Sequence, residues 1–190
     1  DRGYYVADPD FVRVPAQQML SPDYLQQRAN AIAATKAAAA EIKPGSFSQN
    51  MALGRAVELP STSHLVIVDA AGNVVSMTTS IENAFGSTLM ANGYLLNNEL
   101  TDFSFEPEQN GQAVANRVEG GKRPRSSMAP TIVLKNGAPY LAVGSPGGSR
   151  IIGYVAKTLV AHLDWGMDIQ QAIDLPNMLT RGSAYELEEN

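Results

Sequence analysis

Two β-rich runs around a short polar turn constrain the fold of this chain more than any other feature. Residues 64–69 and 74–80 are rich in β-branched side chains, and Ala70-Ala71-Gly72-Asn73 separates them. Such runs on either side of a turn predict an antiparallel hairpin. Within the first run, Leu65-Val66-Ile67-Val68 is apolar without alternation, which predicts a strand covered on both faces.

A second hairpin and two helices are predicted further along the chain. Residues 131–135 and 138–143 are β-rich, and Asn136-Gly137 between them is a favoured two-residue hairpin turn. Residues 149–163 predict a helix whose apolar face carries Ile151, Ile152, Val155, Leu159 and Leu163. Asp168 and Gln171 form a capping-box pattern at the start of a short helix that ends before Pro176. Antiparallel hairpins covered by helices predict an α+β sandwich.

The first sixty residues have a different character. Residues 1–20 lack periodicity, and Ser21-Pro22-Asp23 predicts a helix start, with Ser as N-cap and Pro at the first helical position. The alanine-rich run 29–40 predicts that this helix continues until Lys43-Pro44-Gly45. Residues 46–61 predict a flexible linker, so this front segment is interpreted as a packing arm or a tether.

Composition narrows the function classes. The chain has 190 residues, a net charge of −5 and no basic run, which disfavours a nucleic-acid partner. It has no apolar run near the roughly 18 residues that span a bilayer. The absence of cysteine excludes disulfides, thiolate metal sites and a cysteine nucleophile, and leaves the redox compartment open. No carboxylate–histidine pattern has metal-ligand spacing, so no catalytic metal is predicted. Without a starting methionine or signal-like segment, Asp1 is expected to be a cut boundary.

Several polar segments could build a site for acyl transfer, and each also has an ordinary structural interpretation. A hydroxyl nucleophile needs a base, either one of the two histidines, His64 and His162, or its own amine if it begins a chain. Gly147-Gly148 could offer adjacent N–H groups to an oxyanion, or form a strand-to-helix turn. Glu99 and Asp102 could face an ammonium group or form a solvated edge. Ser126-Ser127 could bind a carboxylate or lie in a loop.

Four motifs in order, together with their distances, resemble the γ-glutamyltranspeptidases. These motifs are Pro60-Ser-Thr-Ser-His-Leu-Val-Ile-Val-Asp69, Asn97-Asn-Glu-Leu-Thr-Asp-Phe103, Lys122-Arg-Pro-Arg-Ser-Ser-Met128 and Gly144-Ser-Pro-Gly-Gly-Ser-Arg150. The resemblance runs from about Asp8 to about Pro176. It implies the fold of N-terminal-nucleophile hydrolases, an αββα sandwich of stacked antiparallel sheets, of which this chain would hold a part.

The resemblance also implies site residues. Self-cleavage between Ser61 and Thr62 would free Thr62 as nucleophile; Ser63 stands where the family has a second threonine. Ser80 would hydrogen-bond the nucleophile, while Gly147 and Gly148 would form the oxyanion hole. The remaining roles concern the substrate: Glu99 and Asp102 for its α-amino group, Ser126 and Ser127 for its α-carboxylate, and Glu82, where several members have asparagine, for the amino group.

The implied activity is γ-glutamyl transfer or hydrolysis on glutathione and related amides, with water, amino acids or peptides as acceptors, in the periplasm or outside the cell. No cofactor or metal is implied. Residues 1–61 would be the tail of a large subunit, and 62–190 most of the small-subunit catalytic region, truncated at its end. The rest of the large subunit, including a carboxylate-binding arginine, would be missing, so this piece alone is expected to be inactive.

Other activities and roles stay open from the sequence. The alternatives are a cephalosporin-type acylase, a capsule transpeptidase of the same superfamily, or a non-catalytic binding module. Whether residues 103–121 form a lid is undecided. His162 is interpreted as a structural residue, Arg150 as a support of the glycine turn, and Trp165-Gly166 as a helix stop with an aromatic anchor.

Overall fold

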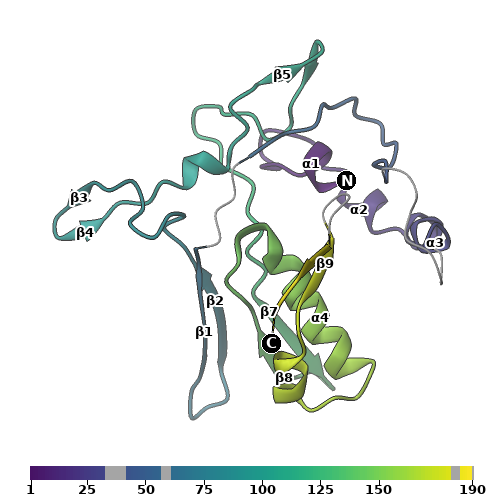
Figure 1. Cartoon of the computed structure of the whole chain (residues 1–190), viewed down its shortest axis with the longest axis vertical. Helices are drawn as coiled ribbons and strands as arrows, with labels where there is room; N and C mark the ends of the chain where they lie inside the picture. The colour runs from purple at the N-terminus through teal and green to yellow at the C-terminus, as the bar shows by residue number, and fades with distance from the viewer. Residues whose placement is uncertain (33–41, 57–60, 181–184, 190) are drawn as a thin grey trace. The chain divides into compact units, whose positions relative to one another are not determined.

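The computed structural model describes residues 1–32, 42–56, 61–180 and 185–189. The chain forms two compact units, each built from two segments. Unit 1 comprises Asp1–Val57 and Leu100–Arg125, and unit 2 comprises Glu58–Glu99 and Ser126–Asn190. The regular elements of the described residues are helices and antiparallel strand pairs, which confirms the α+β class (Figure 1). The predicted boundary at Thr62 is a cleavage site, which a division into compact units does not test, so it stays a prediction.

Unit 2 contains both predicted hairpins. Strand β1 (Ser63–Val68) pairs antiparallel with β2 (Val74–Thr79), and β7 (Thr131–Lys135) pairs with β8 (Ala138–Val143). Asn136 and Gly137 have φ values of 54° and 81°, as the predicted tight turn requires. The two hairpins meet where the Ser76 hydroxyl on β2 donates to the Val143 carbonyl oxygen on β8, at 3.4 Å.

The prediction that β1 is covered on both faces is wrong for the described residues. Five of its six residues are exposed, and Ile67 and Val68 are 56% and 63% exposed. Their apolar character indicates a strand suited to burial, yet the described part of the chain supplies no layer over it. The sequence pattern therefore predicts an apolar strand, but whether that strand is buried depends on which segments pack against it.

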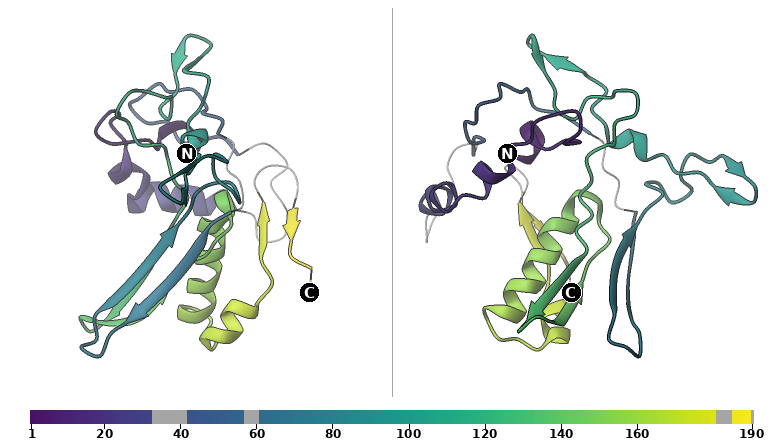
Figure 2. Two further views of the ribbon diagram at one scale, coloured as in Figure 1. Left: turned by 90° about the vertical axis from the view of Figure 1, so that its left-hand side faces the viewer. Right: turned by 180° about the vertical axis from the view of Figure 1, so that it is seen from behind.

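Helix α4 (Ile151–Leu163) follows the short 3₁₀ helix η2 (Gly148–Arg150) and lies along the β7–β8 hairpin (Figures 1 and 2). His162 joins the two elements, because its Nδ1 bonds the Met167 carbonyl oxygen at 2.8 Å and its Nε2 bonds the Tyr140 hydroxyl on β8 at 2.9 Å. A carbonyl only accepts, so Nδ1 carries the proton. The structural interpretation of His162 is confirmed.

The buried face of α4 differs from the predicted one. Ile151 and Val155 are buried as expected, together with Thr158 and Ala161. Ile152 and Leu163 are exposed instead. The helix stop is confirmed, since α4 ends at Leu163 and Gly166 adopts a φ of 70°. The anchoring role of Trp165 is wrong for the described residues, because this side chain is 64% exposed.

Two small elements close unit 2 around α4. Helix α5 (Ile169–Asp174) begins with the predicted capping box of Asp168 and Gln171. The hairpin of β9 (Met178–Thr180) and β10 (Tyr185–Leu187) approaches α4 so closely that a Cβ on Gly153 would lie 2.2 Å from a Leu179 methyl carbon. Unit 2 also carries the two-residue strands β3 (Met90–Ala91) and β4 (Tyr94–Leu95).

Unit 1 has short elements around a small core. Its elements are α1 (Arg2–Tyr5), α2 (Ala16–Met19), α3 (Pro22–Asn30), most of the 3₁₀ helix η1 (Glu99–Asp102), and the paired strands β5 (Glu108–Gln109) and β6 (Gln112–Ala113). Ala7, Val12 and Ala115 pack together with Met51. The Arg123 guanidinium group holds both carboxylate oxygens of buried Asp8, at 2.6 and 2.9 Å.

The front segment is confirmed in part. The Ser21 hydroxyl accepts from the Tyr24 backbone N–H, so the predicted N-cap is correct, but α3 ends at Asn30. Residues 33–41 lie outside the described residues. The flexible linker is wrong for its described part, because Ala52 bridges to Val114 and the Gly54 N–H donates to the Gly3 carbonyl oxygen at 2.9 Å. The structure therefore favours the packing arm.

Over the described ranges, no helix combines the length and the apolar character that a membrane crossing requires.

Candidate active site

The β1–β2 hairpin positions the bond between Ser61 and Thr62. Ser63 pairs with Thr79, so the ends of the two strands bring Ser61 and Ser80 to the same end of the hairpin. The Ser80 hydroxyl donates to the Ser61 carbonyl oxygen at 2.7 Å. The sequence-based prediction gave Ser80 a bond to the Thr62 nucleophile. In the uncut chain the Ser80 hydroxyl instead holds the carbonyl group that Thr62 would attack.

A tight turn after β2 fixes Ser80 itself. The backbone N–H of Glu82 donates to the Ser80 hydroxyl oxygen at 2.9 Å, which is the local bond that serine favours in turns. Glu82 adopts a φ of 69°, and its residue is only 4% exposed. Asparagine tolerates this left-handed backbone better than glutamate does. Glutamate is therefore held in a strained conformation at this position, where several members of the resembling family have asparagine.

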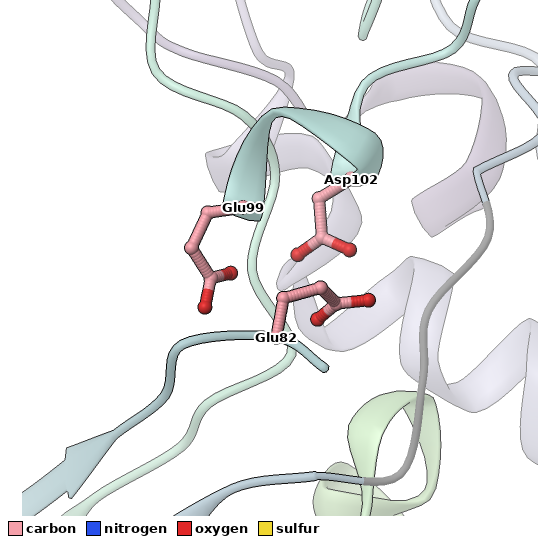
Figure 3. Close-up of side chains that lie close together, drawn as sticks. All are labelled: Glu82, Glu99 and Asp102. Atoms are coloured by element: carbon pink, nitrogen blue, oxygen red, sulfur yellow. The ribbon is translucent and has the colours of Figure 1, made fainter. Parts of the chain in front are cut away.

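Glu82 and Glu99 come together in unit 2. One carboxylate oxygen of each lies within 4.8 Å of the other (Figure 3). Burial raises the pKa of Glu99, and the charge of Glu82 raises it further, although hydrogen bonds from Ser80 and from the Glu82 backbone oppose the shift. Two carboxylates in this setting suit an ammonium group or another cation, since a positive charge would relieve both burial and repulsion. Acidic groups alone do not make a metal centre.

The predicted pair Glu99 and Asp102 lies on one turn of 3₁₀ helix (Figure 3). The Asn97 side-chain oxygen accepts from the Glu99 backbone N–H at 3.0 Å and so starts the turn. Asp102 is 8% exposed, and its carbonyl oxygen accepts from the Asn116 side chain at 2.7 Å within unit 1. The interpretation as a solvated acidic edge is therefore wrong for Asp102, because its side chain is withdrawn from water.

The glycine pair has the backbone geometry predicted for it. Gly147 and Gly148 have φ values of 134° and 56°, which side-chain-bearing residues rarely adopt. A Cβ on Gly147 would lie 2.9 Å from the Tyr154 ring. Arg150 supports the turn as interpreted: its backbone N–H donates to the Gly147 carbonyl oxygen at 3.1 Å, and its side chain pairs with Glu186 on β10 at 2.5 Å. The two glycines thus begin η2 with backbone angles that would be strained for any residue with a side chain.

His64 makes contacts that the sequence did not indicate. The sequence left it as a possible base, but its Nδ1 bonds the hydroxyl of Thr78, its partner across the hairpin, at 2.9 Å. Its ring also lies against Gly144, where an added Cβ would come within 2.2 Å of the ring. His64 therefore connects β1 to the start of the glycine motif. The sequence signal for this contact is Gly144, because a side chain at that position would collide with the ring.

Ser126 and Ser127 begin the second segment of unit 2. Ser127 is 6% exposed, and the Ser126 hydroxyl accepts from the Met128 backbone N–H at 3.1 Å. Ser126 is exposed, so the two hydroxyl groups have different surroundings. This arrangement leaves their assignment to a substrate carboxylate as a prediction.

Comparisons with known proteins show the family of the chain. The family model for γ-glutamyltranspeptidase matches residues 1–190. The glutathione hydrolase proenzyme of Bacillus subtilis (strain 168) is 40% identical over 202 residues, which cover 100% of this chain and 33% of that protein. An acylase proenzyme of Pseudomonas sp. (strain V22) is 33% identical over 191 residues, covering 100% of this chain and 32% of the relative.

A solved structure supports the predicted architecture. The γ-glutamyltranspeptidase of Helicobacter pylori matches with a TM-score of 0.56 and 43% identity, over 62% of this chain and 67% of that one. The chain spans about a third of the length of the curated relatives that it matches. From the match along its entire length, the chain belongs to the γ-glutamyltranspeptidase family.

Proposed function

We propose that the protein containing this chain transfers or hydrolyses γ-glutamyl groups through an acyl-enzyme on Thr62, after cutting itself between Ser61 and Thr62. The observation that carries the proposal is the 2.7 Å hydrogen bond from the Ser80 hydroxyl to the Ser61 carbonyl oxygen. A donor on that oxygen stabilises negative charge that develops there when the carbon is attacked. Names of relatives that include "glutathione hydrolase proenzyme" support the same reading.

Self-cleavage would proceed by an acyl shift. The Thr62 hydroxyl oxygen attacks the Ser61 carbonyl carbon, and the peptide C–N bond breaks as the threonine nitrogen takes a proton. The resulting ester is hydrolysed by water, which leaves a carboxylate on Ser61 and a free amine on Thr62. That amine then supplies the base that a hydroxyl nucleophile needs.

Turnover would use the same hydroxyl on a substrate. The Thr62 amine accepts the hydroxyl proton, the oxygen attacks the γ-carbonyl carbon, and the leaving amine takes a proton. Water or an amino acid then releases the glutamyl group from the ester. The left-handed backbone of Gly147 and Gly148 supports a role for their N–H groups at the oxyanion.

Recognition of the glutamyl end would rest on charge. Glu82 is buried beside half-buried Glu99, whose pKa is raised, and Asp102 is buried on the same short helix as Glu99. An α-ammonium group would offset this negative charge. Ser126 and Ser127 would donate to the α-carboxylate. γ-Glutamyl amides such as glutathione carry both an α-ammonium group and an α-carboxylate.

The activity is tested on the full-length protein with a chromogenic γ-glutamyl anilide, with and without a dipeptide acceptor. We expect anilide release that rises when the acceptor is added. A parallel arm uses a cephalosporin-type acyl side chain that lacks the α-amino group, because one relative is an acylase proenzyme. Faster release from that substrate would favour acylase activity, and no release from either would favour a binding module.

The cleavage site is tested by intact mass. The full-length protein should yield two fragments whose masses match a cut between Ser61 and Thr62. Thr62→Ala should stay as one chain and Thr62→Ser should still be cut, because a primary hydroxyl replaces a secondary one. Ser63→Ala is the matched control and should be cut at the same bond. Persistent cleavage of Thr62→Ala would refute the assignment.

The proposal extends to location and partners. We propose that the protein acts in the periplasm or outside the cell, and that the rest of a large subunit completes the site. Family resemblance is the support for both statements. Cell fractionation with a cytosolic marker tests the location, and co-purification of the two fragments after cleavage tests the partner.

A further inference from the structure

Ser80 has one proton and two acceptors in reach, and this competition gives Glu99 a second role. We propose that Glu99 controls self-cleavage through Ser80: as a neutral acid it leaves the Ser80 proton on the Ser61 carbonyl oxygen, and as a carboxylate it draws that proton away. The proposal rests on the proposed self-cleavage at Thr62. It makes Glu99 a positioning residue for the cut, separate from its predicted contact with the substrate.

Three groups lie around the Ser80 hydroxyl group. Its hydroxyl oxygen lies 2.7 Å from the Ser61 carbonyl oxygen and accepts from the Glu82 backbone N–H at 2.9 Å. The third neighbour is the Glu99 carboxyl group, and its interaction with the Ser80 side chain lowers the pKa of Glu99 against the effect of burial. A carbonyl oxygen can only accept, whereas a carboxyl group accepts when ionised and can donate when protonated. The protonation of Glu99 therefore decides where the single Ser80 proton goes.

The two states of Glu99 have opposite effects on the cut. A carboxylate is a stronger acceptor than a peptide carbonyl, because charge-assisted hydrogen bonds are shorter and stronger than neutral ones. Ionised Glu99 thus removes the donor from the Ser61 oxygen, and its charge repels the developing oxyanion. Protonated Glu99 donates to the Ser80 oxygen, which frees the Ser80 O–H for the Ser61 carbonyl.

The surroundings of Glu99 favour its acid form over its carboxylate form. Burial is the main reason why the pKa of Glu99 is raised, and the Glu82 carboxylate adds to the shift. One of the Glu99 carboxyl oxygens, Oε1, is buried from solvent. Asp102 is the further acidic group on the same helix. Within unit 2, Glu82 in the turn after β2 is the acidic neighbour whose charge raises the pKa of Glu99.

The test compares self-cleavage rates of full-length wild type and Glu99→Gln from pH 5 to pH 8. A glutamine amide donates to the Ser80 oxygen at every pH and so imitates the protonated acid. We expect similar rates at the acidic end, and a wild-type rate that falls behind the variant as pH rises, by up to tenfold per pH unit above the pKa of Glu99. Taking the ratio cancels the pH dependence of Thr62 activation, which both proteins share.

Two further variants bound the effect. Ser80→Ala should cleave about 10²–10³-fold more slowly, as expected for loss of an oxyanion donor, and should show the same rate ratio to Ser80→Ala/Glu99→Gln at every pH. Glu82→Gln removes a charge that raises the pKa of Glu99. The decrease in cleavage rate with rising pH should therefore begin at a lower pH in this variant than in wild type. Circular dichroism and thermal unfolding of each variant exclude folding defects as the cause.

The outcomes separate this inference from the proposed function. Cleavage at Thr62 with a wild-type to Glu99→Gln ratio that is flat in pH would overturn the role of Glu99 and leave the proposed function standing. A pH-dependent ratio that persists in the Ser80→Ala background would also overturn it, since the effect would bypass Ser80. Wild type that is never cut at Thr62, at any pH, would overturn both.

Discussion

Two acidic residues of the predicted site are withdrawn from water. Glu82 is 4% exposed and Asp102 is 8% exposed. A buried carboxylate is unfavourable unless a cation or several donors compensate it. Asp102 shares its short 3₁₀ turn with Glu99, the other residue predicted to contact the substrate α-amino group.

The first prediction concerns Asp102. If it pairs with the substrate ammonium group, Asp102→Asn removes a charge-assisted contact of roughly 1.5–3 kcal/mol and lowers kcat/KM about ten- to a hundredfold. The measurement is kcat/KM of the full-length enzyme on a γ-glutamyl anilide and on its des-amino analogue. Asp164→Asn, an exposed residue, is the control. An unchanged preference for the α-amino substrate would show that Asp102 has no part in recognition.

At the scale of elements, long side chains hold short helices in place. Helix α5 has only six residues and ends at Asp174. The Lys157 ammonium group on α4 donates to the carbonyl oxygens of Ala172, Ile173 and Leu175, at 3.0, 3.2 and 2.7 Å. Carbonyl groups at a helix C-terminus lack helical partners and carry partial negative charge, so a cation there stabilises the helix.

Replacing this lysine should therefore loosen α5. Lys157→Met keeps the aliphatic stem and loses the charged donors, and we expect a loss of about 1–2 kcal/mol in the free energy of unfolding, given partial exposure. Chemical denaturation of full-length wild type and variant measures the difference. Lys135→Met, at an exposed strand end over the Tyr140 ring, should cost less. Equal losses in both variants would contradict the capping role.

A second element-scale prediction concerns the N-terminal segment. Asp8 joins residues near the N-terminus to Arg123, whose guanidinium group and backbone N–H hold the pKa of that carboxyl well below its usual value. A carboxylate with a lowered pKa stabilises the folded state above its unfolded pKa of about 3.9, and this contribution is lost as pH falls below that value. Wild type should thus lose thermal stability between about pH 5 and pH 2.

The test follows melting temperature against pH. Asp8→Asn should melt lower than wild type at pH 7, and the gap should narrow as the solution becomes acidic. Asp10→Asn removes the exposed partner of the same arginine and should change little, because exposed ion pairs contribute little. A gap that stays constant down to pH 2 would mean that the Asp8 charge is not what stabilises this segment.

The whole molecule is organised as two compact units whose segments alternate along the chain. The predicted site residues are divided between them: Thr62, Ser80, Glu82, Glu99, Gly147 and Gly148 belong to unit 2, and Asp102 to unit 1. Apolar residues of β1 are exposed over the described part of the chain. The predicted site residues are therefore not confined to any one hairpin.

We accordingly expect the 190-residue chain alone to be inactive toward γ-glutamyl anilides. It spans about a third of its curated relatives, and an open site lets water weaken each charged contact. The comparison is between the purified chain and the full-length protein in the same assay, with mass analysis of the bond at Thr62. The full-length protein with Thr62→Ala is the inactive control. Turnover by the chain near the full-length rate would contradict the expectation.

What the sequence determined by itself is local. Both hairpins, the Asn136-Gly137 turn, the Ser21 cap and the Asp168 capping box were predictable, because each depends on residues a few positions apart. The motifs also identified the family. Site roles such as those of Ser126 and Ser127 stay predictions, since no sequence pattern states what a hydroxyl group will face.

Only the tertiary structure decided the contacts between distant segments. Ser80 lies on the Ser61 carbonyl, nineteen positions away, and His64 lies against Gly144. The same holds for burial: Asp102 is withdrawn from water although its residue type favours exposure, while apolar Val68 is exposed. Local propensity selects the conformation of a segment, but solvent exposure and hydrogen-bond partners depend on which segments pack together, and that information is spread over the whole chain.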